Sequence, residues 1–302
     1  MAGRVVHGGP GERALAGAWV VLHQVSMAGG GQPIDSTRTN AGGAFTFTVT
    51  RPDTAVVYVV SSLYAGIAYF SEVAKNPRRR RTSLAPIYVY DTSSTGSGVH
   101  VARRVVTVAQ RQRDGARAVL ELVELANPGS KTQVARDTLK PTWTGALPAG
   151  AIQFEVGQGD LSPQTVVRRG DSVAVFAPLP PGASRQLSYA YVLPATARAV
   201  TVPIDQPTDE VDLLLEDTTA VVTAAPLDAL GIEAVEGRRF ARYRVRGAAP
   251  GTRLTIALPA AGLEAQGLVP IVAGLVALIL GVGFVVALRR KPAPLAPSGT
   301  TR

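Results

Sequence analysis

Hydrophobic and polar residues alternate over short stretches along most of the chain, which is the pattern of half-buried β-strands. In residues 44–50 (AFTFTVT), Phe45, Phe47 and Val49 share one face and three threonines share the other. Similar patterns predict strands at 18–25, 55–61, 87–90, 99–108, 151–156, 172–177, 186–193, 211–215, 240–245 and 253–258. Clusters of Gly, Pro, Asn and Asp separate these segments. The chain is therefore predicted to be all-β, with tandem antiparallel β-sandwiches followed by one C-terminal transmembrane α-helix.

One stretch fits two interpretations. Residues 106–125 can be scored as a helix, but Gly115 interrupts them and an Asn-Pro-Gly turn follows at 127–129. Both features favour strands.

Composition shifts suggest where domains meet. A charged, proline-led run at 76–82 ends a first β-sandwich at 1–82, and a second β-sandwich is expected at 83–205. Residues 206–262 form either a third β unit or the completing strands of the second, since two prolines in 203–207 separate the strand groups.

Residues 268–288 (LVPIVAGLVALILGVGFVVAL) contain no charged side chain, and 14 of these 21 residues are Leu, Ile, Val or Phe. As a helix they extend about 31 Å, enough to cross a hydrocarbon core of roughly 30 Å. The segment therefore predicts a transmembrane helix. Within it, Ala273, Ala277 and Gly281 recur on one face, so the sequence leaves open a homodimer packed through this stripe.

The charges that flank this segment predict its orientation. Arg289, Arg290 and Lys291 follow it directly, whereas the fifteen residues before it hold only Arg253 and Glu264. By the positive-inside rule, the tail at 289–302 is cytoplasmic and the rest lies outside the cytoplasmic (inner) membrane, on the periplasmic or extracellular side.

The N-terminal end conflicts with export, since residues 1–25 lack the apolar core of a signal peptide. Either a signal lies upstream of Met1, or the protein is tail-anchored with its bulk in the cytosol. The charge of the tail favours the first interpretation.

The amino-acid composition excludes several classes of structure and chemistry. The 302 residues include no cysteine, which excludes disulfides, thiol catalysis and cysteine-ligated metals, and 46% are hydrophobic, which rules out disorder over most of the chain. Basic residues outnumber acidic ones by 31 to 22. Without the four basic residues after Leu288, 27 stand against 22, a modest excess without the aromatic-lined basic stripe of a nucleic-acid-binding protein.

No pattern typical of catalysis, metal binding or cofactor binding occurs. The histidines His7, His23 and His100 lack metal-ligand spacing, and His23 lies opposite Val20 and Leu22 in a predicted strand. The acidic groups 209–212 and 216–217 are expected at strand ends. No nucleophile elbow, phosphate-binding loop or dinucleotide fingerprint is present. The sequence therefore predicts a protein that is not an enzyme and carries no cofactor.

Two arginine clusters are candidate anion contacts. Arg242, Arg244 and Arg246 alternate with other residues, so three guanidinium groups share one strand face. A second cluster is continuous in sequence and comprises Arg78, Arg79, Arg80 and Arg81. Three interpretations remain open: solvated surface, contact with anionic headgroups or envelope polymers, and contact with a protein partner.

The first predicted domain resembles the carboxypeptidase regulatory-like family of small transthyretin-like sandwiches. The residues that carry the resemblance are 3–6 (GRVV), the strand 17–22 (GAWVVL) and, after a variable loop, 35–47 (DSTRTNAGGAFTF), which matches the family's glycine-containing hairpin. The resemblance covers about 75 residues and implies a domain found beside peptidases, without hydrolytic residues of its own.

Taken together, these features predict a single-pass membrane protein of the bacterial cell envelope. Its non-catalytic β-sandwiches would bind or scaffold an envelope protein or polymer through loops or strand edges. The alternative is an accessory subunit of an envelope enzyme or assembly machine, such as a peptidase or a cofactor-maturation system.

Overall fold

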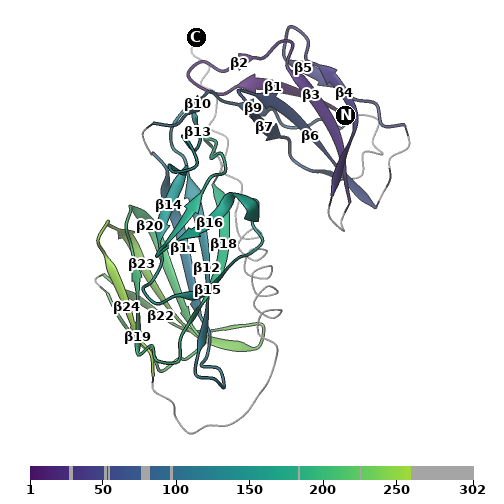
Figure 1. Ribbon diagram of the computed structural model, residues 1–302. Helices are drawn as coiled ribbons and strands as arrows, with labels where there is room; N and C mark the ends of the chain where they lie inside the picture. The colour runs from purple at the N-terminus through teal and green to yellow at the C-terminus, as the bar shows by residue number, and fades with distance from the viewer. Residues whose placement is uncertain are drawn as a thin grey trace, which may run out of the picture. The chain divides into compact units, whose positions relative to one another are not determined.

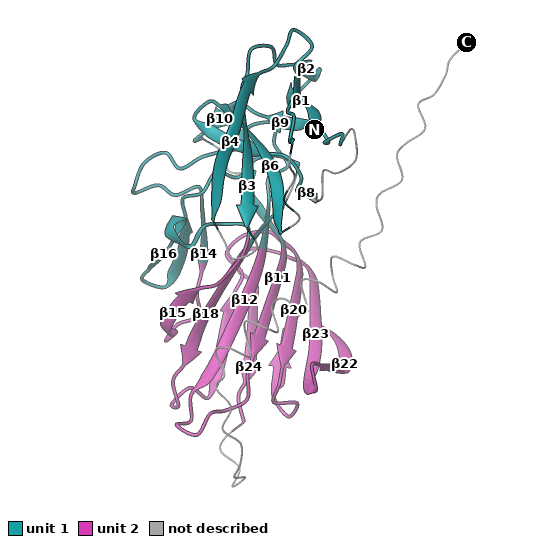
Figure 2. Ribbon diagram, turned by 90° about the vertical axis from the view of Figure 1, so that its right-hand side faces the viewer, with its two compact units in different colours: residues 1–102, 124–145, 160–186 teal, residues 103–123, 146–159, 187–302 magenta. Residues whose placement is uncertain are grey.

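The computed structural model describes residues 1–26, 30–50, 53, 55–75, 82–95, 98–182, 184–224 and 226–259. These residues form an all-β protein, as predicted, with a single 3-10 turn at Pro163–Thr165 (Figure 1). The chain divides into two compact units, drawn in separate colours in Figure 2. The first comprises residues 1–102, 124–145 and 160–186, and the second comprises 103–123, 146–159 and 187–302.

Two sheets built from residues 2–89 belong to the first unit. One has the strand order β4-β3-β6-β7, with β8 also paired to β6, and the other has the order β2-β1-β5, with β9 paired to β1. Their bounds are β1 Ala2–His7, β2 Arg13–Ala14, β3 Trp19–Ser26, β4 Gly31–Arg38, β5 Ala44–Thr46, β6 Val56–Tyr64, β7 Ile67–Phe70, β8 Ala74–Lys75 and β9 Ile87–Val89.

The inward side chains of these two sheets form one core. Val5 and Phe45 come from one sheet, Val20 and Val60 come from the other, and all four are buried in the same hydrophobic cluster. The arrangement is therefore sandwich-like. It is not wholly antiparallel, because β1 and β9 run parallel through the pairs that start at Val5 and Ile87.

The segment expected to be a hairpin links the two sheets instead. β4 and β5 lie in different sheets, so the turn at 40–43 is a corner between layers. Gly43 has φ +71°, and a Cβ there would lie 2.6 Å from the carbonyl oxygen of Val5. Glycine is thus required at this position, although for a corner and not for the predicted hairpin.

The predicted alternation of buried and exposed residues continues past the end of β5, although regular strand pairing does not. Phe47 is buried and Val49 is half-buried, while Thr46 and Thr48 are exposed. β5 itself ends at Thr46.

Three further sheets and one short strand pair follow along the chain. A seven-stranded sheet has the order β15-β18-β12-β11-β20-β23-β22, two three-stranded sheets have the orders β14-β17-β16 and β19-β24-β21, and β10 pairs with β13. Their bounds are β10 Thr92–Ser93, β11 His100–Val108, β12 Arg117–Ala126, β13 Thr132–Gln133, β14 Trp143–Ala146, β15 Ile152–Val156, β16 Val166–Arg169, β17 Ser172–Val175, β18 Arg185–Leu193, β19 Ala199–Pro203, β20 Thr208–Leu215, β21 Val221–Thr223, β22 Asp228–Val235, β23 Arg238–Ala248 and β24 Arg253–Ala257.

The region open to two interpretations forms strands. β11 and β12 are adjacent in the seven-stranded sheet, and Gly115 lies in the turn between them with φ +87°. Since a positive φ is a conformation that glycine adopts without steric cost, the residue that interrupted the helical pattern is the one that permits the turn.

Several predictions concern residues outside those described. These are the transmembrane helix 268–288 with its stripe Ala273, Ala277 and Gly281, the tail 289–302 with Arg289, Arg290 and Lys291, and the run Arg78, Arg79, Arg80 and Arg81. Across the described ranges, no helix has the length and hydrophobicity needed to span a membrane.

Candidate functional site

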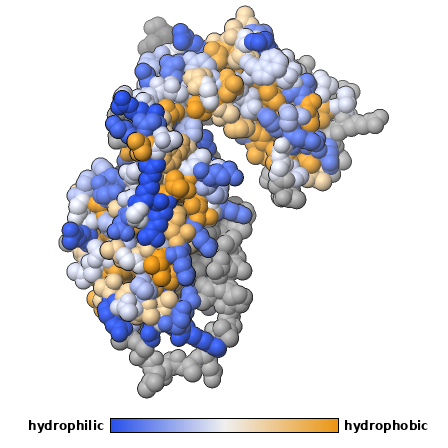
Figure 3. Space-filling model, in the orientation of Figure 1, coloured by the Kyte–Doolittle hydropathy of each residue, from blue (hydrophilic) through white to orange (hydrophobic). Residues whose placement is uncertain are grey.

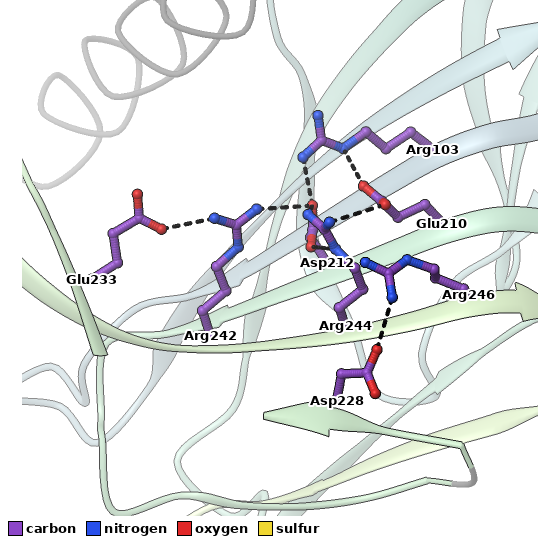
Figure 4. A network of polar contacts seen from close by, with 8 residues as sticks. All are labelled: Arg103, Glu210, Asp212, Asp228, Glu233, Arg242, Arg244 and Arg246. Atoms are coloured by element: carbon purple, nitrogen blue, oxygen red, sulfur yellow. Dashed lines mark hydrogen bonds and ion pairs between the residues drawn. The ribbon is translucent and has the colours of Figure 1, made fainter. Parts of the chain in front are cut away.

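Charged side chains from four adjacent strands meet on one face of the seven-stranded sheet (Figure 4). The strands β11, β20, β23 and β22 are neighbours in that order. The eight residues are four arginines and four carboxylates: Arg103 on β11, Glu210 and Asp212 on β20, Arg242, Arg244 and Arg246 on β23, and Asp228 and Glu233 on β22. We call this set the arginine–carboxylate network.

Asp212 is the centre of the network, and its side chain is fully buried. Arg244 donates from Nε to Oδ1 at 2.8 Å and from Nη2 to Oδ2 at 3.0 Å, which makes a bidentate pair. Arg103 Nη2 donates to Oδ2 at 2.5 Å, and Arg242 Nη2 lies 3.5 Å from the same oxygen. Three guanidinium groups therefore converge on one carboxylate.

The outer carboxylates contact further guanidinium nitrogens of the same arginines and of Arg246. Glu210 lies 3.5 Å from Nε of Arg103 and 3.2 Å from Nη1 of Arg244. Arg242 donates to Glu233 at 2.8 Å. Asp228 accepts a hydrogen bond from Arg246 at 3.0 Å. With four positive and four negative groups, the network is electrically neutral as a whole.

The ionisation of Asp212 reflects its surroundings. Burial raises the pKa of its carboxyl group, but hydrogen bonds from Arg244 and Arg103 outweigh burial and hold the pKa below its ordinary value. Asp212 is therefore ionised in the folded protein, and its carboxylate is the anionic partner that Arg103, Arg242 and Arg244 share.

The three arginines on β23 share a face, as their alternation predicts, but each is already bound to a carboxylate. A phosphate or other polyanion would have to compete with Asp212, Glu210, Glu233 or Asp228 for them. Arg246 is the most accessible, since 62% of its side chain is exposed. The arginines therefore form ion pairs between neighbouring strands and do not form an open cationic patch.

The sequence predicted the positions of the acidic residues in the strands less accurately than those of the arginines. Asp212 was expected at a strand end but lies within β20, between the buried Val211 and Leu213. Glu216 and Asp217 do follow the end of β20, but each forms an ion pair, Glu216 with Arg238 and Asp217 with Arg117. Arg238 makes a bidentate pair with Glu216, with a distance of 2.6 Å from Nε to Oε1. The signal that could have found Asp212 is the matching alternation of acidic residues at 210 and 212 and basic residues at 242–246.

A second buried charge cluster surrounds Glu121 of β12, a residue that sequence reasoning missed. Arg104 donates from Nε to Glu121 at 2.6 Å and from Nη1 to the carbonyl oxygen of Pro203 at 2.8 Å. The hydroxyl groups of Tyr189 and Tyr191 donate to Oε2 and Oε1 of Glu121, at 2.9 and 2.8 Å. Because Pro203 ends β19, this cluster also ties the seven-stranded sheet to the sheet β19-β24-β21.

Burial and the negative charge of Glu121 raise the pKa values of Tyr189 and Tyr191 well above the ordinary value. For Arg104, burial lowers the pKa, but Glu121 more than compensates and raises it. Both tyrosines are therefore neutral donors, and Glu121 has three partners for its two oxygens.

The first unit holds a smaller cluster around His7. Its Nε2 lies 3.3 Å from Oδ1 of Asp91, which also accepts a hydrogen bond from Tyr64 at 2.9 Å. This hydrogen bond raises the pKa of Tyr64 and, with one from His7, lowers the pKa of Asp91. His23 is half-buried, and its Nε2 lies 2.8 Å from Oγ of Ser61. Among the described residues, no group of three or more His, Asp or Glu could hold a metal ion.

No protein-family model matches the chain, and no curated protein matches it either.

Proposed function

We propose that the chain is a membrane-anchored, non-catalytic β-sandwich protein of the bacterial envelope that binds a partner protein or polymer. The observation that carries this proposal is the cross-strand bonding of the charged groups. Asp212 and Glu121, the buried carboxylates at the centres of the two networks, are each bound by side chains from both neighbouring strands. Groups arranged in this way stiffen a sheet, and a stiff sheet is suited to presenting loops and edges to a partner.

The anchor rests on the apolar segment at 268–288 and the basic residues that follow it. The resemblance of the first domain to carboxypeptidase regulatory-like domains supports a non-catalytic module, and two sheets with a shared core are compatible with it. Hydrophobic and hydrophilic residues are interspersed on the face of each unit drawn in Figure 3, so no broad apolar surface is visible there.

Topology is tested by digesting intact cells with a protease after a C-terminal tag is added to the gene in its native context, so that any signal encoded upstream of Met1 is retained. We expect residues 1–267 to be degraded while the tag stays protected, and permeabilised cells to lose both. Protection of residues 1–267 in intact cells would contradict the proposal.

Binding is tested by crosslinking in intact cells and purification in mild detergent. An envelope protein or polymer recovered in a fixed ratio supports the proposal, and an enzyme recovered in this way would favour the role of accessory subunit. A chain recovered alone from crosslinked cells would count against both.

A further inference from the structure

The strand β22 (Asp228–Val235) forms an edge of the seven-stranded sheet that lacks most of the usual protection. Among the described strands it pairs only with β23. Seven of its eight residues are exposed, and none is Pro, Lys or Arg. Edge strands normally carry such residues because an open edge pairs readily with another chain. Two protective features remain. A bulge between Ala229 and Gly231 leaves 231–235 regular, and the acidic side chains of Asp228 and Glu233 are each paired with an arginine of β23.

Other long edges in the described residues are better guarded. β4 is also eight residues long, but it contains Pro33 and its pairing with β3 is irregular at His23. At the opposite edge of the seven-stranded sheet, β15 has an irregular pairing between Ile152 and Glu155, and Gln153 has φ +51°. Of these three edges, β22 is therefore the most open to strand addition.

The turn after β22 determines which of its backbone groups point outward. Glu236 and Gly237 have φ +49° and +79°, the two positive values of a two-residue type I′ hairpin. The flanking pair Val235 and Arg238 is then hydrogen-bonded, as is every second pair beyond it. Ile232 and Ala234 fall at the alternate positions, so their N–H and C=O groups point away from β23.

The side chains on this edge define a pattern. Ile232 and the bulged Leu230 are aliphatic and about half exposed, with 54% and 46% of their surface accessible. Glu233 lies on the other face of the strand, with its side chain 50% exposed and one bond to Arg242. The edge thus offers an aliphatic face at Ile232 and a half-exposed carboxylate between the two outward-pointing residues.

We propose that β22 binds an extended segment of a partner protein as an added antiparallel strand. The segment carries a basic residue opposite Glu233 and aliphatic residues on both sides of it. Backbone bonds to Ile232 and Ala234 supply affinity, while Glu233 and Ile232 supply selectivity. The inference rests on the proposed binding function and names the surface and the chemistry that such binding uses.

A second copy of this chain fits the edge less well. The symmetric pairing that uses both Ile232 and Ala234 places Glu233 opposite Glu233 of the second copy. That pair is not hydrogen-bonded, so the Cα atoms lie about 4.5 Å apart. Like charges directly opposite one another destabilise a strand pair. A basic residue at the same position makes a favourable pair instead.

The test is a selection of displayed random eight-residue peptides on the full-length protein in mild detergent. Three proteins are compared: the wild type, Ala234→Pro and Glu233→Lys. Proline at 234 blocks the edge without removing a bond to β23, because the Ala234 N–H points outward, and sheets accept proline at such positions. Circular dichroism checks that both variants are folded.

We expect the wild type to enrich aliphatic–basic–aliphatic peptides and Ala234→Pro to bind them at least about tenfold more weakly. Glu233→Lys should instead enrich peptides with a central acidic residue. Absence of the pattern, or equal binding by Ala234→Pro, would overturn the proposal. A dimer of the wild type that Ala234→Pro abolishes would assign the edge to a second copy. Because the selection uses purified protein, its result is independent of the topology test in cells.

Discussion

Arg244 and Asp212 form a bidentate ion pair across two neighbouring strands, with 2.8 Å between Arg244 Nε and Asp212 Oδ1. The two residues are 32 positions apart in the chain, and the Asp212 side chain is fully buried. Because Arg103 and Arg242 share the same carboxylate, removing this one anion leaves three guanidinium groups without their common partner.

Asp212→Asn is expected to lower the free energy of unfolding by about 3–5 kcal/mol, as when one partner of a buried ion pair is removed. The measurement is thermal unfolding of the full chain in mild detergent, followed by circular dichroism. The matched control is Asp228→Asn, which breaks the pair with Arg246, where both side chains are more than half exposed. Its effect should be within about 1 kcal/mol. Equal effects of the two substitutions would show that the network does not depend on Asp212.

Acid is expected to weaken the same network. Because the folded-state pKa of Asp212 is below its ordinary value of about 3.9, its contribution is complete above that pH and is lost as the pH falls through the folded-state pKa. The difference in unfolding temperature between the wild type and Asp212→Asn should therefore be constant near neutrality and shrink below about pH 4. A difference that stays constant down to the lowest pH would contradict the assigned ionisation.

Alkali is expected to act on the Glu121 cluster. The raised pKa values of Tyr189 and Tyr191 mean that their contribution is complete below the ordinary tyrosine pKa of about 10 and is lost as the pH rises above it. In a spectrophotometric titration, two of the eight tyrosines should ionise only as the fold is lost. This late fraction should fall by half in Tyr191→Phe. Wild-type protein unfolded in urea is the reference, and a native titration identical to it would refute the prediction.

Gly43→Ala is expected to destabilise the first unit by about 3 kcal/mol. The new Cβ would require a left-handed backbone at φ +71° and would lie 2.6 Å from the Val5 carbonyl oxygen. Gly42→Ala is the control, since a Cβ there meets only Asn40 Oδ1 at 3.5 Å. Its stability should change by less than about 1 kcal/mol. Stability is measured by thermal unfolding. Comparable losses in the two variants would show that the turn at 40–43 does not depend on glycine at position 43 in particular.

Strands with at least one buried face could be predicted from the sequence. The stretches 18–25, 99–108 and 186–193 match β3, β11 and β18 to within one residue at each end, because their hydrophobic residues alternate or run continuously. Alternation did not identify β4 or β22 as strands. β4 contains a single large aliphatic residue, Ile34, and the alternation of Leu230, Ile232 and Ala234 in β22 is short and lies on an exposed edge. Their hydrogen bonds to a neighbour, and not burial, make them strands.

The candidate site could be predicted only in part for a related reason. Alternation placed Arg242, Arg244 and Arg246 on one face, because that pattern lies within one strand. Their partners depend on the strand order, which alternation within single strands does not reveal. Glu121 illustrates this limit, since its tyrosine partners are 68 and 70 residues away.

The position of β24 has a mechanical consequence. It is the middle strand of the sheet β19-β24-β21, paired at five positions with β19 and at three with β21. Just beyond its end, the carbonyl oxygen of Pro259 accepts a hydrogen bond from Arg117 at 3.1 Å. β24 is also the last described strand before the segment predicted to enter the membrane. A pull along the axis of β24 from an anchored C-terminal end would load both rows of hydrogen bonds in shear at once, so they would share the force and not open one after another.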